Sequence, residues 1–182
     1  METNQLVETA LTVEPNQNET QSPHGHASTP TEWIEFRDSD IHGRGGFARK
    51  PIPTGTQVIE YVGRQVTKAE SEILCSENNE YIFDLNEERD LDGKVDWNPA
   101  RLINHSCNPN CYAEQDGDRI FIFAQRKIKP GAELSFNYGF SLKGYQDFPC
   151  LCGDKYCVGF MVAEEFHPLV REENDLPKPP RR

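Results

Sequence analysis

The sequence has too little positive charge for a protein that binds nucleic acid through its phosphates. Its 182 residues include 19 Lys and Arg against 30 Asp and Glu, a formal net charge of −11 at pH 7. Affinity for phosphates depends on many Lys and Arg side chains, so direct nucleic-acid binding is not expected. An acidic protein suits a basic peptide substrate, and solubility alone would equally account for the charge.

The chain also lacks a long apolar run and a secretory leader. No stretch of eighteen or more apolar residues is present, so no membrane-spanning helix or membrane partner is expected. The first ten residues are acidic, with neither a basic start nor an apolar segment. We therefore expect an intracellular, reducing compartment.

Aromatic residues are missing from residues 1–30, which are rich in Gln, Asn, Glu, Thr, Pro and Ser. Such a segment buries too little apolar area to offset its ordering entropy, so it predicts a disordered tail. His24 and His26 within it are interpreted as exposed bystanders rather than metal ligands. The remaining length allows one globular domain, and no internal repeat is evident.

Three cysteines crowd together in the sequence Cys150-Leu-Cys152-Gly-Asp-Lys-Tyr-Cys157. A closed structural zinc site takes four ligands, so this C-x-C-x4-C cluster needs one more from elsewhere. Cys107 in Asn-His-Ser-Cys-Asn-Pro-Asn is the best candidate. The prediction is one structural zinc ion that ties the C-terminal segment to the Asn-His-Ser-Cys region.

The even number of cysteines also permits a disulfide framework, but the absence of a signal peptide argues against it. Two cysteines are left over. Cys75 lies in a predicted helix, where we expect a small core residue. Cys111 is a competing candidate for the metal.

Short alternating segments predict a mostly β domain. Turn residues bound five predicted strands, at residues 33–37, 57–62, 81–85, 119–124 and 133–138. A capping box from Thr67 to Glu70, followed by Ile73 and Leu74, predicts a helix. A further helical turn is expected at residues 99–103, where proline occupies the first turn.

A glycine-rich segment, Gly43-Arg-Gly-Gly-Phe-Ala48, matches the spacing of the dinucleotide fingerprint G-x-G-x-x-G/A. That fingerprint requires a buried strand before it and a helix after it. Here residues 37–42 are polar, and Pro51, Pro53 and Gly55 prevent a helix. The segment is instead interpreted as a turn between two strands, whose backbone can approach a ligand closely.

Taken together, these motifs resemble the SET domain of protein-lysine methyltransferases, followed by a post-SET zinc clip. The resemblance covers about residues 31–166. Its motifs are His42–Phe47, Glu60–Gly63, Tyr81–Phe83, Ala100–Asn110 and Glu133–Tyr138.

The resemblance implies a β-clip architecture of small sheets with short helices, in which two signature segments are threaded as a pseudoknot. We expect a tail at residues 1–30, the SET domain at 31–145, the post-SET zinc segment at 146–166 and a C-terminal tail at 167–182. No cysteine-rich pre-SET segment precedes the domain in this sequence.

The resemblance also implies the site residues. Tyr138 would orient the substrate amine or polarise the methyl group, with Tyr61 and Phe136 forming aromatic walls. S-adenosylmethionine would be held by Gly43, Arg44, Gly45, Gly46, Phe47, Tyr81, Asn104 and His105, and zinc by Cys107, Cys150, Cys152 and Cys157. Arg101 is interpreted as structural.

The implied activity is methyl transfer to a lysine in a basic, histone-like peptide, with S-adenosylhomocysteine as the other product. The nucleophile must be the neutral amine, although its ordinary pKa is about 10.4. A poorly hydrated aromatic channel beside a cationic cofactor lowers that pKa, so no dedicated general base is required. Phe136 stands where a phenol would favour low methylation, and we expect dimethyl- or trimethyl-lysine.

A eukaryotic source would place this activity on chromatin in the nucleus, and a bacterial source in the cytoplasm. The alternatives are a SET-like module that binds peptides without turnover and a zinc-stapled interaction protein.

Three residues depart from the family pattern: Trp97 replaces Gly, Arg64 replaces Glu, and Asn137 replaces the Asp before the catalytic tyrosine.

Overall fold

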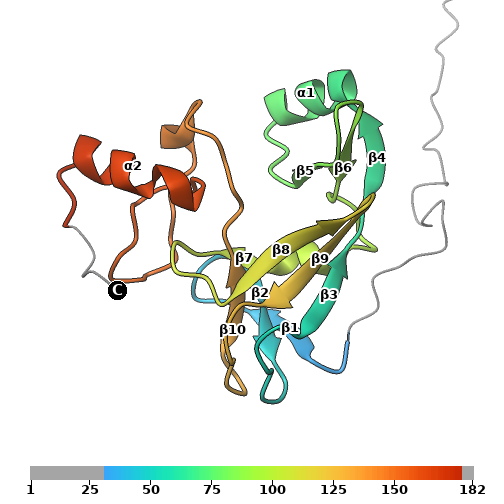
Figure 1. The fold of residues 1–182 in the computed structure, drawn as a ribbon, viewed down its shortest axis with the longest axis vertical. Helices are drawn as coiled ribbons and strands as arrows, with labels where there is room; N and C mark the ends of the chain where they lie inside the picture. Colours follow the sequence, from blue (N-terminus) through green and yellow to red (C-terminus); the bar gives the residue numbers. More distant parts are fainter. Residues whose placement is uncertain (1–30, 178–182) are drawn as a thin grey trace, which may run out of the picture.

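The computed structural model describes residues 31–177 as three small sheets linked by short helices (Figure 1). The prediction of a mostly β fold is confirmed. No helix within this described range has the length and apolarity to cross a membrane. The predicted N-terminal tail, with His24 and His26, lies outside the described residues.

The four-stranded sheet brings distant parts of the chain together. Its order is β1 (Ile34–Asp38), β2 (Arg44–Ala48), β10 (Glu133–Phe136) and β7 (Asn104–His105). Neighbouring strands are antiparallel except for β10 and β7, which run parallel. Ser135 lies opposite Asn104, and Phe136 lies opposite His105. The two central motifs of the sequence therefore meet side by side.

The glycine-rich segment is a strand rather than the predicted turn. Gly45 and Gly46 lie inside β2, which pairs with β1 on one side and β10 on the other. A Cβ atom at Gly46 would come within 2.6 Å of the Ile34 side chain, and one at Gly45 would overlap the carboxylate of Glu133. Because Gly45 and Gly46 have no side chains, the side chains of Glu133 and Ile34 can approach this backbone closely, and not only a ligand can do so. The turn itself lies just before, where Gly43 has φ +48°.

The second sheet supplies the largest share of the main hydrophobic core. It has the order β3 (Gln57–Tyr61), β9 (Arg119–Ala124) and β8 (Cys111–Asp116), all antiparallel. Val58, Ile59 and Ile122 are fully buried against the first sheet's Ile34 and Leu134. Alternating apolar residues predicted β3 and β9 directly.

The third sheet has the order β4 (Arg64–Thr67), β6 (Arg89–Asp92) and β5 (Ile82–Asp84). Helix α1 (Lys68–Ser76) follows β4 directly and begins with the predicted capping box between Thr67 and Glu70. The prediction that Cys75 is a core residue is wrong, because α1 packs through one buried residue, Ser71, and leaves Cys75 exposed.

The C-terminal segment has a small core of its own and stands beside the sheets (Figure 1). Tyr145, Val158, Val162 and Val170 are buried together. This region contains η2 (Tyr145–Asp147), η3 (Glu164–Phe166) and α2 (His167–Glu173), and the turn η1 (Pro99–Leu102) precedes β7. Helix α2 lies at the start of residues 167–182, which were predicted to be a tail, and its residue Val170 is buried in this small core. The expected domain boundaries remain predictions.

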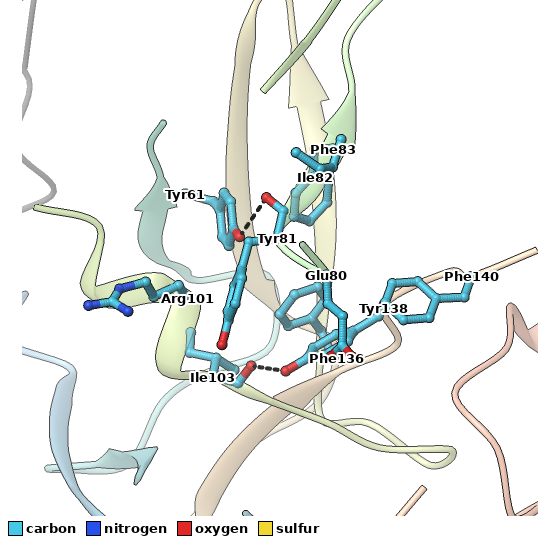
Figure 2. A pocket seen from close by; sticks show the side chains of 10 residues that line it. All are labelled: Tyr61, Glu80, Tyr81, Ile82, Phe83, Arg101, Ile103, Phe136, Tyr138 and Phe140. Atoms are coloured by element: carbon cyan, nitrogen blue, oxygen red, sulfur yellow. Dashed lines mark hydrogen bonds between the residues drawn. The ribbon is translucent and has the colours of Figure 1, made fainter. Parts of the chain in front are cut away.

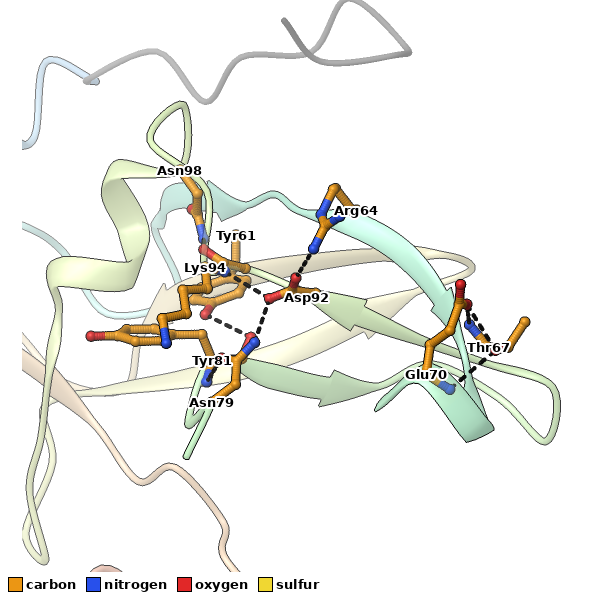
Figure 3. A network of polar contacts seen from close by, with 10 residues as sticks. Tyr61, Arg64, Thr67, Glu70, Asn79, Tyr81, Asp92, Lys94 and Asn98 are labelled. Carbon is orange, nitrogen blue, oxygen red and sulfur yellow. Dashed lines mark hydrogen bonds and ion pairs between the residues drawn. The ribbon is translucent and has the colours of Figure 1, made fainter. Parts of the chain in front are cut away.

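A buried carboxylate holds the third sheet to the loop before η1 (Figure 3). Asp92 is 1 % exposed and accepts hydrogen bonds from Asn79 Nδ2 at 2.9 Å and from the backbone N–H of Lys94 at 3.0 Å. Arg64, which departs from the family pattern, pairs with it at 2.7 Å. Burial by itself would raise the pKa of Asp92, but the three donors together lower it.

We predict that Asp92→Asn lowers the free energy of unfolding by about 1–3 kcal/mol, because the neutral amide loses the ion pair with Arg64 and has only one acceptor oxygen for the buried donors. The folded-state pKa lies below the ordinary 3.8, so this contribution is present above that value and is lost as the pH falls through the folded pKa. Denaturant unfolding at several pH values measures the difference. Asp84→Asn, whose carboxylate in the same sheet is 83 % exposed, should change little. Equal losses in the two variants, or a difference that persists in acid, would contradict the assignment.

Candidate active site and metal centre

Aromatic rings from three separate segments converge on a narrow channel (Figure 2). The Tyr61 and Phe83 centroids lie 4.7 Å apart, those of Phe83 and Phe136 6.1 Å, and those of Phe136 and Tyr138 4.9 Å. The channel volume is about 20 Å³, room for little more than a water molecule. Its walls are mainly aromatic rings.

Tyr61 is fixed at its hydroxyl end. Its Oη donates to the carbonyl of Tyr81 at 3.2 Å, and its ring occupies the space that a side chain at Gly93 would fill. Asn98 Oδ1 accepts a hydrogen bond from the backbone N–H of Val62, the residue after Tyr61. Asn98 Nδ2 donates to the carbonyl of Gly93. Burial, followed by the neighbouring Tyr138 and Tyr81, raises the pKa of Tyr61 far above its ordinary value. The phenol is therefore a neutral donor.

Tyr138 is held at both ends. Its Oη donates to the carbonyl of Ile103 at 3.0 Å, and its backbone N–H donates to His105 Nδ1 at 3.2 Å. Burial, then the charges of Tyr81 and Glu80, raise the pKa of Tyr138 well above 10.0. The hydroxyl keeps its proton, and it can donate that proton to a ligand only by releasing the carbonyl of Ile103.

His105 connects this tyrosine to a cysteine. Burial lowers the pKa of His105 to about 4, so the ring is neutral near pH 7. Since Nδ1 accepts from Tyr138, the proton belongs on Nε2, which lies 3.7 Å from Cys107 Sγ. A neutral imidazole in this tautomer donates toward a thiolate.

A second, larger cavity of about 480 Å³ lies beside the channel. Five of the eight residues expected to hold the cofactor line it: Gly43, Arg44, Tyr81, Asn104 and His105. The opposite wall is apolar and comes mainly from the C-terminal segment, through Phe148, Leu151 and Met161. The size is that of a typical small-molecule site, and mixed polar and apolar walls fit a nucleoside with a charged amino-acid end.

The other three expected residues do not reach the cavity. Gly45 faces Glu133 and Gly46 faces Ile34, both inside the sheet. Phe47 is buried beneath the guanidinium of Arg37, 3.5 Å from its ring centroid. These three residues position Gly43 and Arg44 within the glycine-rich segment and do not themselves contact the cavity.

Asn104 joins the glycine-rich segment to β10. Its Nδ2 lies 2.8 Å from Glu133 Oε1, 3.1 Å from Ser39 Oγ, 3.3 Å from the His42 carbonyl and 3.2 Å from that of Arg44. Ser39 Oγ donates to the same Glu133 oxygen at 2.7 Å. Sequence reasoning missed Ser39 and Glu133, although Glu133 opens the predicted strand that ends at Tyr138.

The four predicted zinc ligands come together. The Sγ atoms of Cys107, Cys150, Cys152 and Cys157 all lie within 4.8 Å of one another. Cys107 Sγ is 3.7 Å from both Cys150 Sγ and Cys157 Sγ. A tetrahedral site with Zn–S bonds of about 2.3 Å has sulfur–sulfur edges of about 3.8 Å, so the spacing fits zinc and is too long for disulfides.

The surroundings of the sulfur cluster also fit a metal. The backbone N–H of Gly159 donates to Cys157 Sγ at 3.2 Å, as expected for a thiolate ligand. Hydrogen bonding with the neighbouring cysteine side chains, followed by burial, raises the pKa of Cys107, and a bound cation would favour the thiolate. Cys111, the competing candidate, is fully buried in β8 within the main core and lies outside the cluster.

Comparison with known proteins identifies the class. The SET domain family matches residues 43–139, more than half of the chain, and the chain belongs to this family. It is 41 % identical over 143 residues to the histone-lysine N-methyltransferase trr of Drosophila melanogaster, covering 71 % of this chain and 6 % of that protein. It is 38 % identical over 144 residues to the human histone-lysine N-methyltransferase 2D, covering 72 % of this chain and 3 % of that protein. The histone-lysine N-methyltransferase ATXR7 of Arabidopsis thaliana is 38 % identical over 136 residues, covering 68 % and 10 %. The chain thus spans a small part of the relatives' length.

We predict that purified protein contains zinc and that Cys152→Ser loses it, because three thiolates leave the site open. Hydrogen exchange at residues 149–166 should then accelerate by at least about tenfold, since metal binding contributes folding energy to such short loops. Elemental analysis and exchange mass spectrometry measure both effects. Cys75→Ser, an exposed cysteine outside the cluster, is the matched control. Zinc-free wild-type protein with a well-protected segment would contradict the assignment.

Proposed function

We propose that this chain is an S-adenosylmethionine-dependent protein-lysine N-methyltransferase. The observation that carries the proposal is that the narrow channel and the large cavity share four wall residues, Glu80, Tyr81, Arg101 and Tyr138. These residues form an aperture between a slot for an alkyl amine and a chamber for a nucleoside-sized molecule. Two reactants bound from opposite sides would meet there.

The large cavity would hold the cofactor, which supplies an electrophilic methyl group on a sulfonium when bound. Gly43 and Arg44 offer backbone groups at the end of β2, and Asn104 and His105 form the adjoining wall. Phe148, Leu151 and Met161 would cover the bound cofactor from the other side. The chain thereby fixes the direction from which a methyl group reaches the aperture.

The narrow channel would hold the substrate lysine. Tyr61, Phe83 and Phe136 desolvate the amine, which lowers its pKa and favours the neutral nucleophile. Alignment of two reactants across the aperture can contribute about 7–11 kcal/mol of barrier lowering. The neutral Tyr138 hydroxyl stands at the aperture to orient the amine.

The proposed substrate is a lysine in a basic, histone-like tail. Two features support it: the relatives are histone-lysine methyltransferases by name, and the net charge of −11 attracts basic peptides. The nucleus is the proposed location, on the same grounds. The proposed products are dimethyl- or trimethyl-lysine, because no phenol occupies position 136.

A binding module without turnover is the competing function. Titration calorimetry with S-adenosylmethionine tests for a cofactor site, and labelled methyl transfer to histones and peptides separates an enzyme from a reader. Saturable cofactor binding with transfer to lysine supports the proposal. Absence of cofactor binding by zinc-loaded protein would overturn it.

We predict that Tyr138→Phe lowers kcat by about 10²-fold or more, because orientation of the amine at the aperture is lost. The variant also loses one hydrogen bond to Ile103, at a cost of about 1 kcal/mol in stability. Cofactor affinity measured by calorimetry should change less than about threefold. A variant that turns over at the wild-type rate would show that the hydroxyl has no part in the reaction.

We predict that Phe136→Tyr shifts the product toward monomethyl-lysine with little loss in the first transfer. Phe136 is 3 % exposed and lies between Phe83 and Tyr138, so a hydroxyl there can bind the amine or a water molecule in the channel. Mass spectrometry of a peptide under excess cofactor reads the product distribution. Phe83→Tyr adds the same group to the channel from another strand. Wild-type protein that stops at monomethyl-lysine, or an equal shift in both variants, would contradict a specific role for position 136.

A further inference from the structure

The aperture between the two cavities carries one acidic side chain. Glu80 lines both the narrow channel and the large cavity, and its exposed carboxylate makes no hydrogen bond or ion pair with any side chain among residues 31–177. Its charge reaches the centre of the site, since it is among the causes that raise the pKa of Tyr138. No other wall residue common to both cavities is an acid.

The basic residue at the aperture is turned outward. Arg101 also lines both cavities, but its guanidinium binds Asp96 at 3.0 Å, and Asp96 is wholly exposed. Figure 2 shows the guanidinium pointing away from Tyr138. Among residues 31–177, Glu80 is therefore the charged side chain common to both cavities that has no ion-pair partner.

We propose that Glu80 is a specificity-determining residue that makes the site prefer S-adenosylmethionine over S-adenosylhomocysteine. This inference rests on the proposed function. The two molecules differ by one methyl group and one positive charge, because the first is a sulfonium and the second a neutral thioether. The proposed methyl direction brings that sulfur to the aperture, where a nearby carboxylate stabilises the charged form alone.

The same carboxylate affects release of the product. Methyl transfer cancels the charge on the sulfur, so the product loses the attraction that held the reactant. Glu80 thus weakens product inhibition without contacting the nucleoside. Because the carboxylate is solvent-exposed, its effect is screened and amounts to about three- to tenfold in affinity.

The test is titration calorimetry of both molecules with zinc-loaded wild-type protein and with Glu80→Gln. We expect the variant to bind S-adenosylmethionine about three- to tenfold more weakly and S-adenosylhomocysteine within about twofold of wild type. The change in the ratio should shrink as salt rises from about 0.05 to 0.5 M. Asp147→Asn is the matched control, because Asp147 is an exposed acid that lines the large cavity but not the channel.

The outcomes separate this inference from the proposed function. Wild-type protein that binds both molecules, with an unchanged ratio in Glu80→Gln, overturns the role of Glu80 and leaves the methyltransferase intact. An equal shift in Asp147→Asn also overturns it, since the general charge of the cavity would then be responsible. Failure of wild-type protein to bind either molecule overturns the proposed function itself.

Discussion

The site depends on the parallel pairing of β7 with β10. Two strands of two and four residues have few backbone hydrogen bonds of their own, so side chains must hold the register. Asn104 does this from β7 by reaching the Glu133 carboxylate on β10. The same carboxylate receives Ser39 and occupies the space above Gly45. One partly buried acid thereby fixes the strands that carry Asn104, His105, Phe136 and Tyr138.

The metal centre and the channel are adjacent parts of one arrangement. His105 accepts from the backbone of Tyr138 through one nitrogen and faces Cys107 with the other. Asn137, which departs from the family pattern, donates to the carbonyl of Val162 at 3.0 Å and so binds the C-terminal segment beside the tyrosine. A ring that stays neutral near pH 7 can serve both neighbours without changing its charge.

Sequence reasoning succeeded where a pattern is set within one segment or by the number of ligands that a metal takes. The C-x-C-x4-C spacing lacks a fourth ligand, and the structure brings Cys107 to that place. The capping box at Thr67 and the alternation in β3 and β9 were likewise read directly. These signals are local in the sequence or rest on the coordination number of zinc.

The failures have two causes. The roles of Glu133, Gly45 and Gly93 depend on which strands become neighbours, and no periodicity within one segment reports that. Glycine was interpreted as a place for a ligand, whereas Gly45 and Gly46 make room for protein side chains. Cys75 was placed in the core by residue type, but a short edge helix left it exposed.

The walls of the large cavity come from two parts of the chain, each of which has its own hydrophobic core. Gly43, Asn104 and His105 belong to the sheets, whereas Phe148, Leu151 and Met161 belong to the segment that is packed on Val158 and Val162. Whatever holds the two cores together therefore shapes the cavity, and the sulfur cluster spans that junction. A molecule bound in the cavity and a metal bound to the sulfur cluster would therefore act on one arrangement of the two parts, and any effect of one on the affinity for the other would be reciprocal.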